Sequence, residues 1–140
     1  LVAYPPEIEG GRVDGQHLVC NGLDLLPTLC DYAGVDPPDG LAGRSFRAVA
    51  TGSPPAGWRE TLVVESQESR MVRDDRYKYI LWDHEANREQ LFDLRQDPYE
   101  TVNRINEPGL AANRDALRAT LRAWADDIGD QRGLDSLRSL

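Results

Sequence analysis

The sequence is poor in residues that several protein classes depend on, and each shortage excludes a class. Two cysteines, Cys20 and Cys30, can form at most one bridge, which excludes a scaffold built on disulfides. The formal net charge of -8 excludes nucleic acid as a partner, because nucleic-acid binding needs a basic surface. No apolar run approaches the roughly 20 residues of a membrane helix, and no basic-then-apolar signal peptide opens the chain. We therefore expect no membrane partner, and localisation stays open between cytoplasm and periplasm.

The 140 residues are enough for one domain or for part of a larger one. The chain opens with Leu1 rather than methionine, and residues 1–4 have the apolar pattern of a strand interior. These two features predict a segment cut from a longer protein. Such a segment would expose the apolar face that met the missing part, and it could self-associate through that face.

The first 60 residues contain one clear helix signal. Residues 1–20 are expected to be extended, and a helix is expected over 24–33. Asp24 suits the N-cap and Pro27 falls in the first turn, where its missing N–H costs little. The apolar face of this helix consists of Leu25, Leu26 and Leu29. Residues 34–60 are rich in proline and glycine and are expected to be mostly loop, and long loops of this kind are usually functional.

The rest of the chain alternates strand patterns with one long helical pattern. The strand and hairpin candidates are 61–64, 71–82 with a turn at Asp74-Asp75, and 90–94. A helical spacing connects Leu110, Leu117, Leu121, Trp124 and Ile128. This spacing predicts a helix over 108–128, followed by a frayed tail from Gly129. The fold class is therefore α+β, with a small antiparallel sheet covered by the C-terminal helix.

The side chains that commonly carry chemistry do not assemble into a catalytic motif. His17 and His84 are the only histidines, and lone surface histidines are far commoner than metal ligands. His17-x-x-Cys20 followed by Cys30 lacks the paired spacing of a zinc site. The sequence contains no GxxxxGK[ST] loop, no GxGxxG and no GxSxG elbow. The residues alone thus indicate an α+β piece without a self-contained active site.

Four segments follow one another in a characteristic order. They are 23–29 (LDLLPTL) with 33–38 (AGVDPP), 40–46 (GLAGRSF), 71–80 (MVRDDRYKYI), and 90–94 (QLFDL) with 97–100 (DPYE) and Asn103. In this order and spacing they resemble the C-terminal part of the type I sulfatases, which are arylsulfatase-like members of the alkaline-phosphatase-like superfamily. The opening 1–6 (LVAYPP) is similar to the strand of that family that ends in a proline-containing turn.

The resemblance implies that residues 1–60 are the C-terminal end of an α/β sulfatase core, with a strand, a short helix and a long loop. Residues 61–140 would form a small C-terminal subdomain. The parent protein would hydrolyse sulfate esters with a formylglycine, made from a C/S-x-P-x-R motif, and a divalent cation, usually calcium. Cys20, Cys30 and Ser53 do not start such a motif.

No catalytic or metal-binding residue therefore carries over, and the chain alone should be inactive. The resemblance implies two partners. One is the N-terminal catalytic part of the same protein, which would hold the calcium and the formylglycine, and the other is a small-molecule or sugar sulfate ester.

By the resemblance, the loop after the 61–64 strand is the best candidate for reaching the substrate. Glu65, Gln67 and Arg70 could contact polar groups of a sugar there, and His17 and the 36–47 loop are further candidates. The alternative is that these are ordinary surface residues. Two other functions stay open: the parent could be a related phosphohydrolase or phosphonate hydrolase, or the chain could be an autonomous interaction or substrate-binding module.

Overall fold

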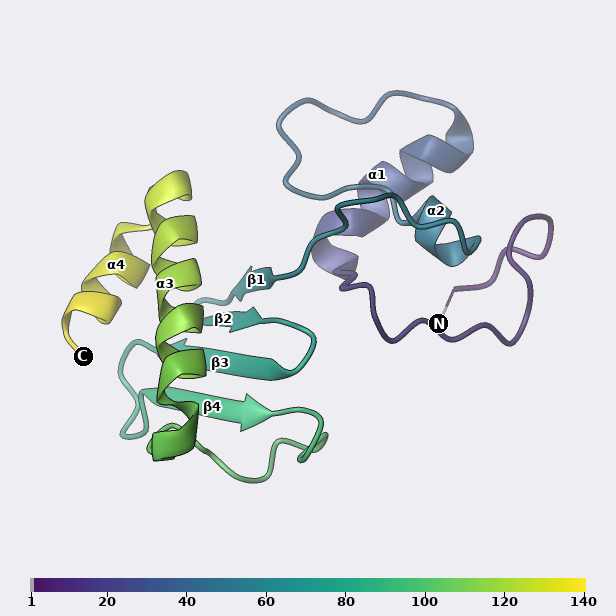
Figure 1. Cartoon of the computed structure of the whole chain (residues 1–140). Coiled ribbons are helices and arrows are strands. Elements are labelled where there is room, and N and C mark those ends of the chain that lie inside the picture. The colour runs from purple at the N-terminus through teal and green to yellow at the C-terminus, as the bar shows by residue number, and fades with distance from the viewer. Residues whose placement is uncertain (1) are drawn as a thin grey trace. The chain divides into compact units, whose positions relative to one another are not determined.

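The computed structural model describes residues 2–140, which form two compact units (Figure 1). One unit ends at Glu60 and the other spans Thr61–Leu140. Each unit has its own apolar cluster and its own buried arginine–aspartate pair. No helix among residues 2–140 is long and apolar enough to cross a bilayer.

The second unit is built on an antiparallel sheet whose four strands lie in the order β1-β2-β3-β4 (Figure 1). The strands are β1 (Leu62–Glu65), β2 (Ser69–Arg73), β3 (Tyr77–Trp82) and β4 (Glu89–Asp93). Side chains alternate along β3, where Tyr77 and Tyr79 are buried and Lys78 is half-buried. The hairpin expected around Asp74-Asp75 is confirmed, and the Asp74 carboxylate closes its turn by accepting the N–H of Tyr77 at 2.6 Å.

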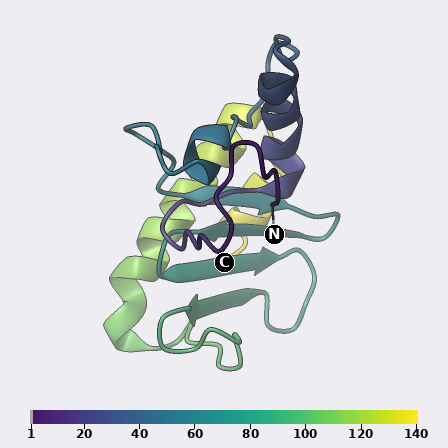
Figure 2. The ribbon, with the colours of Figure 1, turned by 90° about the vertical axis from the view of Figure 1, so that its right-hand side faces the viewer.

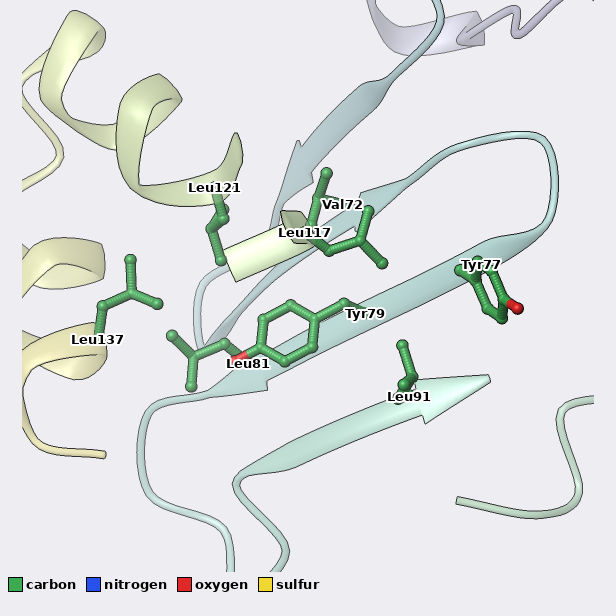
Figure 3. Packing of buried hydrophobic residues seen from close by; sticks show 8 residues of the cluster. All are labelled: Val72, Tyr77, Tyr79, Leu81, Leu91, Leu117, Leu121 and Leu137. Carbon is green, nitrogen blue, oxygen red and sulfur yellow. The ribbon is translucent and has the colours of Figure 1, made fainter. Parts of the chain in front are cut away.

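Two helices, α3 (Ala111–Ile128) and α4 (Gln131–Arg138), cover one face of this sheet (Figure 2). A 3-10 turn, η1 (Pro108–Leu110), leads into α3, so the helix expected over 108–128 is confirmed apart from its first turn. Figure 3 shows the core between sheet and helices, which contains Val72, Tyr77, Tyr79, Leu81, Leu91, Leu117, Leu121 and Leu137. An antiparallel sheet with helices on one face is the α+β class that the sequence predicts.

The prediction of a frayed tail from Gly129 is wrong, because residues Gln131–Arg138 form α4. Gly129 adopts a φ of 72° and ends α3, as glycine does without strain. Asp130 then accepts the N–H of Gly133 at 3.0 Å and caps the next helix. The side chains of Leu134 and Leu137 are buried, and the burial of this apolar pair holds the tail in place.

The first unit contains the helices α1 (Asn21–Ala33) and α2 (Arg47–Ala50), and residues 2–60 form no strand. The expected strand at 1–4 is therefore not formed over residues 2–4, and Leu1 lies outside the described residues. The expected helix is confirmed, but it begins at Asn21 rather than at Asp24. Asp24 lies inside the helix and its carboxylate reaches back to accept the N–H of Cys20 at 2.8 Å.

The leucine face predicted for α1 (Leu25, Leu26 and Leu29) is exposed rather than packed. Their exposed fractions are 48%, 48% and 56%. The buried side of α1 instead carries Asp24, Pro27 and Thr28. Because residues 2–60 form no strand, this unit offers no sheet for the leucines to pack against. Its small apolar cluster comes from the 46–58 segment and contains Phe46, Val49 and Trp58.

Candidate functional site

Two of the predicted site residues, Glu65 at the end of β1 and Gln67 in the turn between β1 and β2, are exposed. Ser66 and Ser69 close this turn, because the N–H of Ser66 donates to the carbonyl of Ser69 at 2.8 Å. The Ser66 hydroxyl also accepts the N–H of Ser69 at 3.1 Å. Within the described residues no hydrogen bond or ion pair engages the side chains of Glu65 and Gln67. A free carboxylate and a free amide on a closed turn can bond to the hydroxyls of a sugar.

Arg70, the third residue predicted for this loop, lies inside the unit and is only 5% exposed. Its Nε and Nη2 donate to the two carboxylate oxygens of Asp130 at 2.7 and 2.8 Å. The bonds from Arg70 lower the pKa of Asp130 below its usual range, although burial acts in the opposite direction. Direct contact between Arg70 and a substrate would require this buried pair to break. The structure therefore places Arg70 behind the turn, where it joins β2 to the start of α4.

His17 belongs to the unit that ends at Glu60 and forms a pair with Asp14. Its Nδ1 lies 2.7 Å from Asp14 Oδ2, and its backbone N–H donates to Asp14 Oδ1 at 2.9 Å. The backbone bond from His17 is the largest cause that lowers the pKa of Asp14. The imidazole ring stands edge-on to Trp58, with 6.3 Å between the ring centres. This arrangement orients the ring and leaves Nε2 without a hydrogen-bond partner among the described residues.

The most deeply buried charged group of this first unit is Asp24, which is 0% exposed. It accepts two bonds from Arg59, both at 2.6 Å, and the N–H of Arg44 at 3.0 Å. Burial alone would raise the pKa of Asp24, but the bonds from Arg59 and from backbone N–H groups lower it. Asp24 therefore has a structural role, because each of its carboxylate oxygens already accepts hydrogen bonds from the protein.

Two residues that contact the β1–β2 hairpin, Asp130 at Arg70 and Arg132 at Gln67, were not predicted from the sequence. Arg132 donates from Nη1 to the carbonyl of Gln67 at 2.7 Å. The expectation of a frayed tail concealed both residues. A local signal was present: an aspartate follows the helix-ending Gly129, and Leu134 and Leu137 repeat at helical spacing.

The described residues do not fit the calcium ion or the formylglycine that the sulfatase resemblance implies. Within residues 2–140 no group of three or more histidine, cysteine, aspartate or glutamate side chains could hold a metal ion. Cys20 and Cys30 are free thiols rather than a disulfide, and neither lies in a C/S-x-P-x-R motif. What the described residues offer is a polar surface on a turn closed by hydrogen bonds.

Comparison with known proteins shows a match over residues 1–127 to the family described as N-sulphoglucosamine sulphohydrolase, C-terminal. The chain is 37% identical over 144 residues to the Delta 4,5-hexuronate-2-O-sulfatase of Bacteroides thetaiotaomicron, which covers 96% of this chain and 29% of the relative. The solved structure of a 2-O GAG sulfatase matches with a TM-score of 0.72 at 33% identity, over 92% of this chain and 28% of that one. The phosphonate monoester hydrolase SpPMH of Silicibacter pomeroyi shares the fold at 22% identity, with a TM-score of 0.60, over 74% of this chain and 24% of that one. The chain thus spans less than a third of the length of each of these proteins.

Proposed function

The chain belongs to the family of N-sulphoglucosamine sulphohydrolase C-terminal domains, and from this membership we propose that it is the C-terminal part of an enzyme that hydrolyses sulfate esters of sugars. The resemblance of its motifs to those of sulfatases is confirmed by the family match. The observation that carries the proposal is the 37% identity to a Delta 4,5-hexuronate-2-O-sulfatase over 96% of the chain. That relative and the 2-O GAG sulfatase of similar structure favour a sugar sulfated at its 2-position as the substrate class.

In this proposal the chemistry belongs to the N-terminal catalytic part of the same protein. That part would carry the formylglycine as nucleophile and the calcium ion that polarises the sulfate group. The proposal is supported by the absence of a C/S-x-P-x-R motif from the 140 residues and by their coverage of 29% of the relative. The chain by itself is then expected to be inactive.

The leucine face of α1 supports an intramolecular partner for the first unit. Three leucines, each about half exposed, lie on a helix whose other side is buried. Apolar surface of this kind on one helix face is typical of an interface. We infer that the catalytic part of the protein covers it, and that the isolated chain can self-associate through the same leucines.

For the second unit we propose that the β1–β2 turn borders the substrate. Glu65 and Gln67 are exposed and free of intramolecular bonds, so their oxygen and nitrogen atoms are available to sugar hydroxyls. His17, oriented by Asp14, is the candidate in the first unit. Arg70 contributes indirectly, because its pair with Asp130 supports the strand that follows the turn.

The assignment is tested by assaying the full-length protein with a Delta 4,5-hexuronate 2-O-sulfate and with 4-nitrophenyl sulfate. Calcium-dependent release of sulfate from the sugar is the expected result, and no turnover is expected from the 140-residue chain. Release of sulfate by the chain alone would contradict the proposal that the chemistry belongs to the N-terminal catalytic part. Hydrolysis of a phosphonate monoester in place of any sulfate ester would favour the phosphonate hydrolase alternative, which the shared fold keeps open.

The proposed covering of the leucine face is tested with Leu26→Glu, in the chain alone and in the full-length protein. Because Leu26 is half exposed, the variant should leave the stability of the isolated chain within about 0.5 kcal/mol and reduce its self-association. In the full-length protein, burying the new carboxylate should lower stability by about 2–3 kcal/mol. Val13→Glu is the control, because Val13 is 94% exposed outside any helix. Equal, small effects in both proteins would instead favour an autonomous module.

A further inference from the structure

Helix α4 lies beyond residue 127, where the family match ends, and yet it contacts the β1–β2 turn directly. Arg132 in its first turn donates from Nη1 to the carbonyl of Gln67 at 2.7 Å. The Nε of the same side chain lies 2.7 Å from Asp83 Oδ2. One arginine of α4 therefore holds the tip of the turn and the end of β3 together.

Asp83 extends this connection, because it is bonded both to α4 and to the turn. Its carboxylate accepts the hydroxyl of Ser136 at 2.9 Å, and its backbone N–H donates to the carbonyl of Glu68 at 3.0 Å. Both residues at the tip of the turn, Gln67 and Glu68, thus have their carbonyl groups held by partners outside the turn.

The start of α4 is also fixed by close contacts. Asp130 caps Gly133 and binds Arg70 at the same time, which leaves no room for a side chain at position 133. A Cβ there would lie 2.3 Å from Asp130 Oδ2 and 3.3 Å from Arg70 Nε. Arg70, Arg132, Asp83 and Asp130 form a group whose charges balance. Within it, the buried Nη1 of Arg70 lies 3.6 Å from Asp83 Oδ2.

We propose that α4 is a positioning element that holds the β1–β2 turn in the conformation in which Glu65 and Gln67 meet the sugar. This inference rests on the proposed function in one respect, namely that the turn borders the substrate. The physical reason is preorganisation: a turn that is ordered before binding loses less conformational entropy when the sugar arrives. Arg132 is the positioning residue, since it acts on the substrate only through the turn.

The test compares Arg132→Gln with Arg138→Gln in the full-length protein. Arg138 lies on the same helix, is exposed, and pairs only with Asp135 among the described residues. We expect Arg132→Gln to raise KM for a Delta 4,5-hexuronate 2-O-sulfate about three- to tenfold and to leave kcat unchanged. A rise of this size corresponds to the entropy cost of ordering one or two side chains. KM for 4-nitrophenyl sulfate, which has no sugar to contact the turn, should stay unchanged. The control should change neither value.

Hydrogen exchange gives a second readout that is independent of activity. In Arg132→Gln the amides of Ser66 and Ser69 should exchange at least about tenfold faster, while those of Leu81 in β3 and Leu91 in β4 stay protected. If the loss of charge disturbs α4 as a whole, Arg132→Lys replaces it. Lysine retains the attraction to Asp83 but cannot span both contacts, so the turn should still exchange faster and KM should still rise.

The outcomes separate this inference from the proposed function. If Gln67→Ala raises KM for the sugar sulfate while Arg132→Gln changes neither KM nor exchange in the turn, the positioning role is overturned and the substrate contact stands. If Arg132→Gln speeds exchange in the turn but neither variant changes KM, the turn does not border the substrate and both ideas are overturned. A rise in KM for both substrates with Arg132→Gln would show a general structural defect and would also overturn the positioning role.

Discussion

The two units of this chain reach stability by different means. The second unit buries eight apolar residues between its sheet and its helices. Among the described residues of the first unit, the buried apolar cluster contains Phe46, Val49 and Trp58, and the ion pair between Asp24 and Arg59 is also buried. The leucine face of α1 is exposed instead. The difference teaches that the second unit has a large apolar core, whereas the first has a small apolar cluster and a buried ion pair.

The sharpest way to break this comparison is Asp24→Asn. This change leaves the Arg59 guanidinium, whose side chain is 9% exposed, without its charged partner. Removing one partner of a buried pair typically costs about 3–5 kcal/mol, more than so small an apolar cluster can offset. We expect the first unit to unfold while the second persists. The indole N–H signals of Trp58 and Trp82 report the two units separately, since these groups donate to Leu18 O and Gln90 Oε1.

The control for this experiment is Asp39→Asn, because Asp39 is exposed on an irregular segment. Both indole signals should keep their positions in that variant. Loss of the Trp82 signal together with that of Trp58 in Asp24→Asn would contradict the separate stability of the units.

A second experiment compares two leucines, one from each unit. Leu121→Ala removes a side chain that is 1% exposed in the core of the second unit and should cost about 3 kcal/mol. Leu26→Ala, on the exposed face of α1, should change the stability of the isolated chain by about 0.5 kcal/mol or less. Urea denaturation followed by far-ultraviolet circular dichroism measures both. Similar losses in the two variants would show that the leucine face of α1 is packed in solution.

Acid should affect the first unit before the second. The pKa of Asp24 is lower in the folded chain than its ordinary value, so the unfolded chain binds the proton first as pH falls. The ordinary pKa of an aspartate is about 4. Above that pH the Asp24 carboxylate contributes fully to the stability of the first unit, and this contribution is lost as pH falls through the folded pKa. We therefore expect the Trp58 indole signal to disappear below about pH 4. The pKa of Asp130 in the second unit is also lowered, but the Trp82 signal should persist to lower pH, because the apolar core of that unit does not depend on a carboxylate.

The smallest expected effect comes from the ion pair between Lys78 and Glu100, whose atoms lie 2.7 Å apart on the partly exposed face of the sheet. Lys78→Met should lower the stability of the second unit by no more than about 1 kcal/mol, because such pairs are screened by water and salt. Urea midpoints in low and high salt measure it, and the difference between variant and parent should shrink in high salt. A loss comparable to that of Leu121→Ala would mean that ion pairs contribute as much to the stability of the second unit as its apolar core does.

The sequence predicted the strands and helix α3 of the second unit because their signals are local. Alternation in Tyr77–Trp82 and the spacing from Leu117 to Leu121 require only neighbouring residues. The position of Arg70 could not be predicted in this way, since its partner Asp130 lies 60 residues along the chain. Helix α4 was missed for a related reason: eight residues form a stable helix only when tertiary contacts bury one face.

The candidate site divides along the same line. That the loop after the first strand is exposed and polar follows from its composition, and Glu65 and Gln67 are exposed in the structure. Which of its neighbours is free to meet a ligand does not follow, because Arg70 is indistinguishable from a surface arginine until its partner is known.

By itself, the sequence determined the α+β class, the family and the lack of a nucleophile motif in these 140 residues, because all three depend on residue order alone. Only the tertiary structure decided that Asp24 and Arg70 are buried, that the leucine face of α1 is exposed, and that the last residues form a helix that holds the β1–β2 turn. The physical reason is that a charge is buried only where a partner from a distant segment compensates its lost hydration, and folding alone brings such segments together.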